Sequence, residues 1–150
     1  ECTVIHTPDI NRGNLLGLIR SHDRIICLGH GNKDGLFSGD KSRLVINKSF
    51  VQLLQKKICI FIWCHAKDFM KQWDISGFGT GMIISEPFEA MFLNIPFTFD
   101  SIEESNRLLV DGIIHGLKQD NFCLDTFQEI LVSRFTAESS VGEFNKRNLL

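Results

Sequence analysis

Two short segments of this chain combine residue types that can perform nucleophilic chemistry. The first is Gly29-His30-Gly31 and the second is Cys64-His65-Ala66. A cysteine thiolate is a strong nucleophile, and a nearby imidazole activates the thiol by taking its proton. A helix that begins just after Cys64 would lower the thiol pKa further through its dipole and its free amides. The segments therefore predict a Cys-His dyad, with Cys64 as nucleophile and His30 as base.

Each of these segments follows an apolar run of the kind that forms a buried strand. Residues 24–28 precede His30, and residues 58–63 precede Cys64. Runs that are apolar almost throughout are typical of parallel strands covered on both faces. Ligands and chemistry gather beyond the carboxyl ends of such strands. We therefore expect His30 and Cys64 to lie at one edge of a parallel sheet.

The first half of the chain alternates further strand and helix patterns around this pair. We expect a short strand over residues 3–6 and a helix introduced by Pro8-Asp9. A small hairpin is predicted from residues 35–37 and 44–46. Asn47 or Ser49 is expected to cap a helix over residues 50–54, and another helix is expected from Ala66 to Trp73.

In the second half, a glycine-rich turn over residues 76–81 is expected to lead into a buried strand over residues 82–85. Helices are predicted after Glu86-Pro87, from a capping box at residues 101–104 to about Leu117, and from Asp125 or Thr126. The last fifteen residues are mostly polar and are expected to be loosely ordered. Alternating strands and helices predict a three-layer α/β/α sandwich with a mostly parallel sheet. We interpret residues 1–150 as one domain whose first strand lies upstream of Glu1.

Composition narrows the classes of function. The chain has 150 residues and a formal net charge of −2, without a basic stripe interleaved with aromatics, so nucleic acid is not expected as a partner. No apolar run reaches the length of a membrane span, so no membrane association is expected either. The five cysteines are an odd, widely spaced set without a CxxC pair, which favours a reducing cytoplasm.

No cofactor is expected, because a Cys-His dyad works without one. A metal site built from the imidazoles and thiol of this region would lack the close ligand spacing of structural zinc sites, so no metal is expected. The residues considered for it are His6, His30, Cys64 and His65.

The pattern resembles the caspase-like fold of cysteine peptidases, the group that contains caspases, metacaspases, gingipains and CHAT domains. It consists of an apolar strand ending in His30-Gly31, a glycine-containing hairpin, a helix, and an apolar strand ending in Cys64, 34 positions later. The likeness covers roughly residues 24–93 and is closest to small bacterial members of the group.

The resemblance implies a cysteine endopeptidase that acts on a peptide or protein substrate. His30 would be the general base and acid, Cys64 the nucleophile, and the amides of Gly31 and Cys64 the oxyanion hole. The reaction would pass through an acyl-enzyme. His65 is a poor base for the adjacent Cys64, although it can line the site. Asp34 and Glu86, and less directly Asp40, are the carboxylates expected near the substrate.

Two other functions stay open at this point. One is a non-catalytic binding or sensor module of caspase-like or flavodoxin-like fold, for example a pseudoenzyme in a bacterial defence or signalling system. The other is cleavage of a glycosidic bond in nucleotides, which needs well-placed carboxylates, with Glu86 and Glu89 as candidates past a strand end. Formation of a homo-oligomer is also open.

Overall fold

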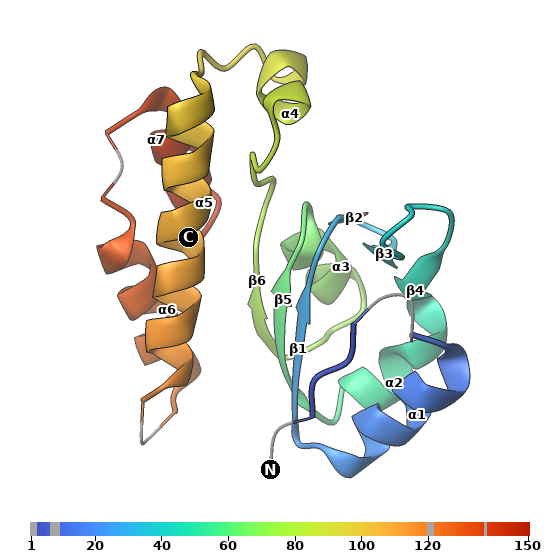
Figure 1. The fold of residues 1–150 in the computed structure, drawn as a ribbon. Coiled ribbons are helices and arrows are strands. Elements are labelled where there is room, and N and C mark those ends of the chain that lie inside the picture. Colours follow the sequence, from blue (N-terminus) through green and yellow to red (C-terminus); the bar gives the residue numbers. More distant parts are fainter. Residues whose placement is uncertain (1–2, 7–9, 120–121, 137) are drawn as a thin grey trace. The chain divides into compact units, whose positions relative to one another are not determined.

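The computed structural model of the chain describes residues 3–6, 10–119, 122–136 and 138–150 (Figure 1). It divides into two compact units, residues 1–81 and residues 82–150, and each is described by itself. The prediction that residues 1–150 form a single domain is not tested by this division and stays a prediction.

The first unit contains the predicted parallel sheet. Its strands are β1 (Arg24–Leu28), β5 (Ile58–Ile62) and β6 (Gly77–Gly79), in the order β1-β5-β6. Both pairs of neighbours are parallel. The mixed α/β character with a parallel sheet is therefore confirmed.

A second, antiparallel sheet lies in the same unit. Its strands are β2 (Gly31–Asn32), β3 (Gly35–Phe37) and β4 (Leu44–Ile46), in sequence order. The β3–β4 pair is the predicted hairpin, and β2 extends it. Because β2 begins directly after His30, this sheet fixes the path of the chain on leaving β1.

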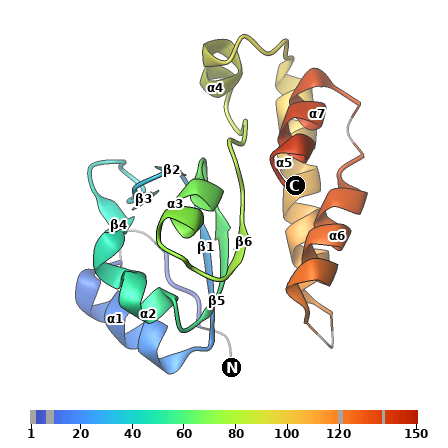
Figure 2. The same cartoon turned by 180° about the vertical axis from the view of Figure 1, so that it is seen from behind.

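The helices of the first unit share one apolar cluster. They are α1 (Arg12–Ser21), the 3₁₀ turn η1 (Lys48–Phe50), α2 (Val51–Leu54) and α3 (Ala66–Gln72). Their buried side chains meet those of Cys59, Phe61 and Trp63. Figures 1 and 2 show these helices on the same side of the sheet. Right-handed crossovers give this result when successive strands are added in one direction.

Strand β1 differs from its prediction as a strand buried on both faces. Ile25 and Cys27 pack against the helical cluster, whereas Ile26 and Leu28 remain exposed. The cause is the alternation of side chains on an edge strand, which turns every second residue away from the helices. Ile58, at the start of β5, is exposed as well.

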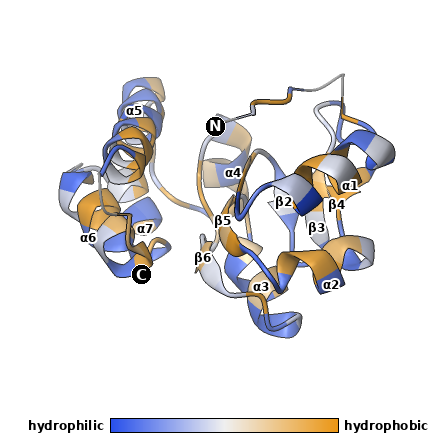
Figure 3. Cartoon of the chain, turned by 90° about the horizontal axis from the view of Figure 1, so that it is seen from below, coloured by the Kyte–Doolittle hydropathy of each residue, from blue (hydrophilic) through white to orange (hydrophobic). Residues whose placement is uncertain are grey.

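The second unit is helical. It consists of α4 (Pro87–Phe92), α5 (Phe99–Leu117), α6 (Leu124–Arg134) and α7 (Ser140–Arg147). Hydrophilic and hydrophobic residues alternate along α5 and α6 in Figure 3, as expected for helices with one apolar face. Among the described residues, no helix is both long and apolar enough to cross a membrane.

Residues 82–85 do not form the predicted strand, and the final residues are not loosely ordered. The amide of Ile84 donates to Asn145 Oδ1 at 2.7 Å, and Asn145 Nδ2 donates to the Ile84 carbonyl at 2.7 Å. Asn145 also donates to Ser105 Oγ at 2.8 Å and is buried. The Asn145 side chain thus makes the hydrogen bonds to Ile84 that a neighbouring strand would otherwise make, and these bonds anchor α7.

Two further predictions are corrected, and a third lies outside the described residues. Residues 3–6 form no strand. The capping box of α5 lies at Thr98 and Ser101, three residues before the predicted one, because each side chain accepts from the other's amide. The N-cap of α1 is Asn11, whose side chain accepts from the amide of Asn14 at 3.0 Å, while Pro8-Asp9 lies outside the described residues. The predicted start and end of α3, the start of α4 and the end of α5 agree with the structure to within one residue.

Candidate functional site

The pairing of β1 with β5 brings His30 and Cys64 to the same edge of the sheet. The register runs from Arg24 opposite Ile58 to Leu28 opposite Ile62, a constant offset of 34 residues. The amide of Gly29 donates to the Ile62 carbonyl at 3.1 Å, so the pairing extends past the last strand residue. His30 and Cys64 each lie two residues beyond the last paired positions, Leu28 and Ile62. Both residues are half-buried.

Trp63 joins the two segments. Its ring stacks on Phe61 with centroids 4.6 Å apart, and its Nε1 donates to the Asn32 carbonyl at 3.1 Å. A Cβ atom added to Gly31 would lie 2.3 Å from Trp63 Cδ1, so only glycine permits this contact. Trp63, the residue before Cys64, therefore holds in place the strand that follows His30. An apolar residue at the end of an apolar strand gave no signal of this role.

Thr80, which follows β6, forms hydrogen bonds with the end of β5 and with the residue after it. Its buried hydroxyl donates to the Trp63 carbonyl at 2.7 Å, and its amide donates to the Phe61 carbonyl at 3.1 Å. The predicted glycine-rich turn is in fact β6 and its continuation. Glycine is required there because a Cβ on Gly79 would lie 2.9 Å from the amide nitrogen of Lys67 in α3. Thr80 was missed because the glycines around it indicated a turn.

The start of α3 does not offer the free amides expected beside Cys64. The amide of His65 donates to the Gly81 carbonyl at 3.1 Å, that of Ala66 to Trp63 at 3.1 Å, and that of Lys67 to Thr80 at 2.9 Å. Because these donors already have acceptors, they do not stabilise a thiolate at Cys64. The amides expected to be free at the start of α3 are therefore already bonded, and activation of Cys64 by His30 stays a prediction.

His65 itself is directed to the helix. It adopts the left-handed conformation with φ +66° as the N-cap of α3, and its Nδ1 lies 2.9 Å from Asp68 Oδ2. The side chains of both residues are largely exposed. This contact gives His65 a structural role at the start of α3.

The antiparallel ladder of β2 and β3 constrains the direction of the Gly31 amide, while its role in an oxyanion hole stays a prediction. The Phe37 amide donates to the His30 carbonyl at 2.8 Å, and the next pair in the ladder is Gly31 with Leu36. Antiparallel ladders alternate between bonded and non-bonded pairs, so the Gly31 amide points away from β3. The matching role of the Cys64 amide stays a prediction.

The three carboxylates that were expected near the substrate lie in different parts of the structure. Asp34 is at the tip of the β2–β3 turn, with its carboxylate 3.2 Å from Lys33 Nζ. Asp40 accepts from Ser38 and Ser42, and these hydrogen bonds lower the pKa of its carboxyl to about 2. Glu86 belongs to the second unit, as the N-cap of α4. A substrate-binding role for Asp34 and Glu86 stays a prediction.

The alternative function, cleavage of a glycosidic bond, was based on carboxylates that lie just past a strand end, and the structure does not place them there. Glu86 and Glu89 do not follow a strand, because residues 82–85 are not one. Glu89 Oε2 instead accepts from the amides of Ser85 at 2.7 Å and Glu86 at 3.1 Å, as part of the capping box of α4.

The described cysteines are all free thiols, and they differ sharply. Burial raises the pKa of Cys59 to about 12, and burial together with the neighbouring Cys59 raises that of Cys27 to about 12. Cys123 is exposed, and the amides of Thr126 and Asp125 donate to its sulfur and lower its pKa. Any test of Cys64 must therefore separate it from Cys123.

A cavity of about 230 Å³ lies away from the dyad. Its wall includes Arg12 and Arg43, and its floor includes Leu15, Val45 and Phe50. Neither His30 nor Cys64 lines this cavity. Within the described ranges, no three His, Cys, Asp or Glu side chains are grouped closely enough to bind a metal ion.

Comparison of the chain with protein families, with curated proteins and with solved structures found no match. The function must therefore be argued from the geometry alone.

Proposed function

We propose that this chain is a cysteine peptidase in which Cys64 is the nucleophile and His30 the general base and acid. The observation that supports the proposal is the parallel pairing of β1 with β5, since His30 and Cys64 each follow the paired strand ends, Leu28 and Ile62, by two residues. The carboxyl edge of a parallel sheet is where α/β proteins gather catalytic groups.

The reaction follows from these positions. His30 takes the proton of the Cys64 thiol, and the thiolate attacks the carbonyl carbon of a peptide bond. The carbonyl oxygen becomes an oxyanion, to which the Gly31 amide donates a hydrogen bond. The C–N bond then breaks, and His30 returns the proton to the leaving amine. Water, deprotonated by His30, hydrolyses the acyl-enzyme and restores the thiol.

A caspase-like sandwich, with helices on both faces of the sheet, is part of this proposal. Its support is the apolar face that β1 and β5 turn away from the helical cluster. Ile26, Leu28 and Ile58 are exposed on the face of the sheet opposite the helical cluster, where a caspase-like fold carries its other helical layer. Ile60 and Ile62 on that face are buried. A thiolate nucleophile also favours a reducing compartment, in agreement with the expectation of a cytoplasmic protein.

The proposal is tested with a fluorogenic peptide library and the purified chain. We expect cleavage of a subset of peptides by the wild type, and loss of at least 99 % of that activity in Cys64→Ala and in His30→Ala. Cys123→Ser is the matched control and should keep full activity. Cleavage that persists in Cys64→Ala, or an inert wild type, would contradict the proposal.

The second candidate is a binding module for a small anion. The observation that favours it is the cavity lined by Arg12 and Arg43, since guanidinium groups recognise carboxylate and phosphate. Within the described residues neither arginine joins a salt bridge, and Arg43 donates to the Ile10 carbonyl at 3.1 Å. Under this function, phosphate would raise the melting temperature of wild type and Cys64→Ala equally, and Arg43→Gln would abolish the rise.

A further inference from the structure

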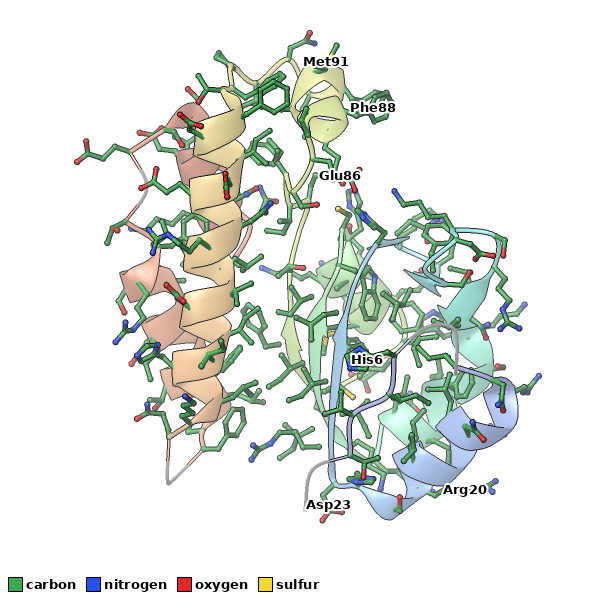
Figure 4. The ribbon with its side chains drawn as sticks, in the orientation of Figure 1. His6, Arg20, Asp23, Glu86, Phe88 and Met91 are labelled. Carbon is green, nitrogen blue, oxygen red and sulfur yellow. The ribbon has the colours of Figure 1, made fainter. Side chains whose placement is uncertain are left out.

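Helix α4 presents an unusual surface. One side of this short helix is buried through Ala90, which packs with Ile84, Ile102 and Val141 of the second unit. The other side carries Phe88, Met91 and Phe92, whose spacing of three and four residues places them on one face. Figure 4 shows Phe88 and Met91 projecting away from the ribbon of α4.

These large apolar side chains are exposed to an extent that folding does not explain. Phe99, the first residue of α5, is a further exposed aromatic residue of the same unit, and its ring meets Phe97 edge-on at 6.4 Å. The exposed fractions are 72 % for Phe88, 64 % for Met91, 75 % for Phe92 and 76 % for Phe99. We call these four residues the α4 patch. Large apolar side chains exposed to this extent mark interaction sites when they gather on one surface.

The charged residues close to the α4 patch in the sequence are all acidic. From Gln72 to Asn106 the sequence contains no lysine and no arginine. The exposed carboxylates in that stretch are Glu86 at the start of α4, Asp100 next to Phe99, and Glu103 and Glu104 in the first turns of α5. An apolar centre with an acidic rim is complementary to a segment that combines apolar anchors with lysine or arginine.

The same charges argue against other occupants. In a symmetric dimer through this patch, the acidic rims of two copies would face each other. The patch would also supply roughly 500 Å² from its four side chains, less than the ~800 Å² per partner of a standard interface. Anionic lipid would be repelled by the rim. A short peptide segment matches both the area and the charge.

We propose that the α4 patch binds a basic peptide segment of a partner protein, anchored by apolar side chains over Phe88 and Phe92. This inference is independent of the dyad, since it uses only residues of the second unit. The contact is short and salt-dependent, because its charged part lies at an exposed rim.

The probe is a fluorescein-labelled, eighteen-residue peptide of leucine and lysine in helical spacing, titrated with the full chain and read by anisotropy. We expect binding at low salt and at least a tenfold loss of affinity in the double variant Phe88→Ser/Phe92→Ser. Asp100→Asn/Glu103→Gln should weaken binding three- to tenfold and reduce its salt dependence. Val110→Ser, an exposed apolar position on α5 outside the patch, is the matched control and should bind as the wild type does.

Four outcomes would overturn the proposal. The wild type fails to bind the peptide at low salt, or binding is unchanged in Phe88→Ser/Phe92→Ser. A peptide with glutamate in place of lysine binds equally well. In sedimentation, the wild type forms a dimer that the double variant dissociates, so that a second copy covers the patch. Vesicles of phosphatidylserine and phosphatidylcholine bind the wild type more tightly than the lysine peptide does.

Discussion

Cys64 and Cys123 both lie just before a helix, Cys64 two residues before α3 and Cys123 directly before α6, yet their surroundings differ. At Cys123, the N-cap of α6, the amides of Thr126 and Asp125 donate to the sulfur. At Cys64, the amides that follow it donate to backbone carbonyls of Gly81, Trp63 and Thr80 instead. The position of a cysteine before a helix therefore does not decide its reactivity. What decides it is whether the first amides of the helix are already used.

The comparison predicts which cysteines react with iodoacetamide at pH 8. Cys27 and Cys59, with pKa values near 12, should label about a thousandfold more slowly than Cys123, because the thiolate is the reactive form. The rate at Cys123 should rise with pH at values below those of a free thiol, since its pKa is lowered. Mass-spectrometric mapping measures all sites together. Equal labelling rates at Cys27, Cys59 and Cys123 in the native protein would contradict the burial of the first two. As a control, the three cysteines should label at equal rates when the protein is unfolded in urea.

Gly31→Ala should disturb the packing of Trp63, the residue before Cys64, and leave the surroundings of Cys123 unchanged. The new Cβ would lie 2.3 Å from Trp63 Cδ1 and 2.6 Å from the Gly35 carbonyl oxygen. We expect the free energy of unfolding to fall by about 3 kcal/mol, as for overpacking of a rigid site. Urea unfolding followed by tryptophan fluorescence measures it.

The matched control for this substitution is Gly17→Ala in α1. The new Cβ would have no neighbour within 4 Å, and alanine favours the helix, so a gain of about 1 kcal/mol is expected. If both variants change stability in the same direction, the contact between Gly31 and Trp63 does not position the site.

Thr80→Val should have a smaller effect on the same loop. It removes the hydroxyl that donates to the Trp63 carbonyl at 2.7 Å, at a cost of about 1–2 kcal/mol for a buried hydrogen bond. Thr80→Ser keeps the donor and should remain within 0.5 kcal/mol or so of the wild type. Equal losses in the two variants, measured by urea unfolding, would assign the effect to the methyl group and not to the hydrogen bond.

The sequence indicated the parts of the site that depend on local pattern. The apolar runs before His30 and Cys64 predicted neighbouring parallel strands, and the hairpin and α3 followed from turn and helix signals. These features depend on residues close together in the chain, where propensity and periodicity carry information.

The remainder depends on contacts that no local pattern encodes. Asn145 forms hydrogen bonds with the backbone of Ile84, 61 positions away in the sequence. These bonds take the place of the strand pairing predicted for residues 82–85, and they hold the C-terminal helix in place. Thr80 and Trp63 fix the loop of Cys64 through hydrogen bonds to distant carbonyls. A buried polar residue satisfied by a distant partner looks, in the sequence, like any other polar residue.

The central claim is that His30 activates Cys64, and the most direct test measures the pH dependence of alkylation at Cys64. The background should be Cys2→Ser/Cys123→Ser, which removes the thiol with the lowered pKa and the one outside the described residues. We predict an apparent pKa for Cys64 well below the ~8.5 of a free thiol, and at least a tenfold slower reaction at pH 7 in His30→Ala. An unchanged rate in His30→Ala would contradict the dyad and leave Cys64 as an ordinary half-buried thiol.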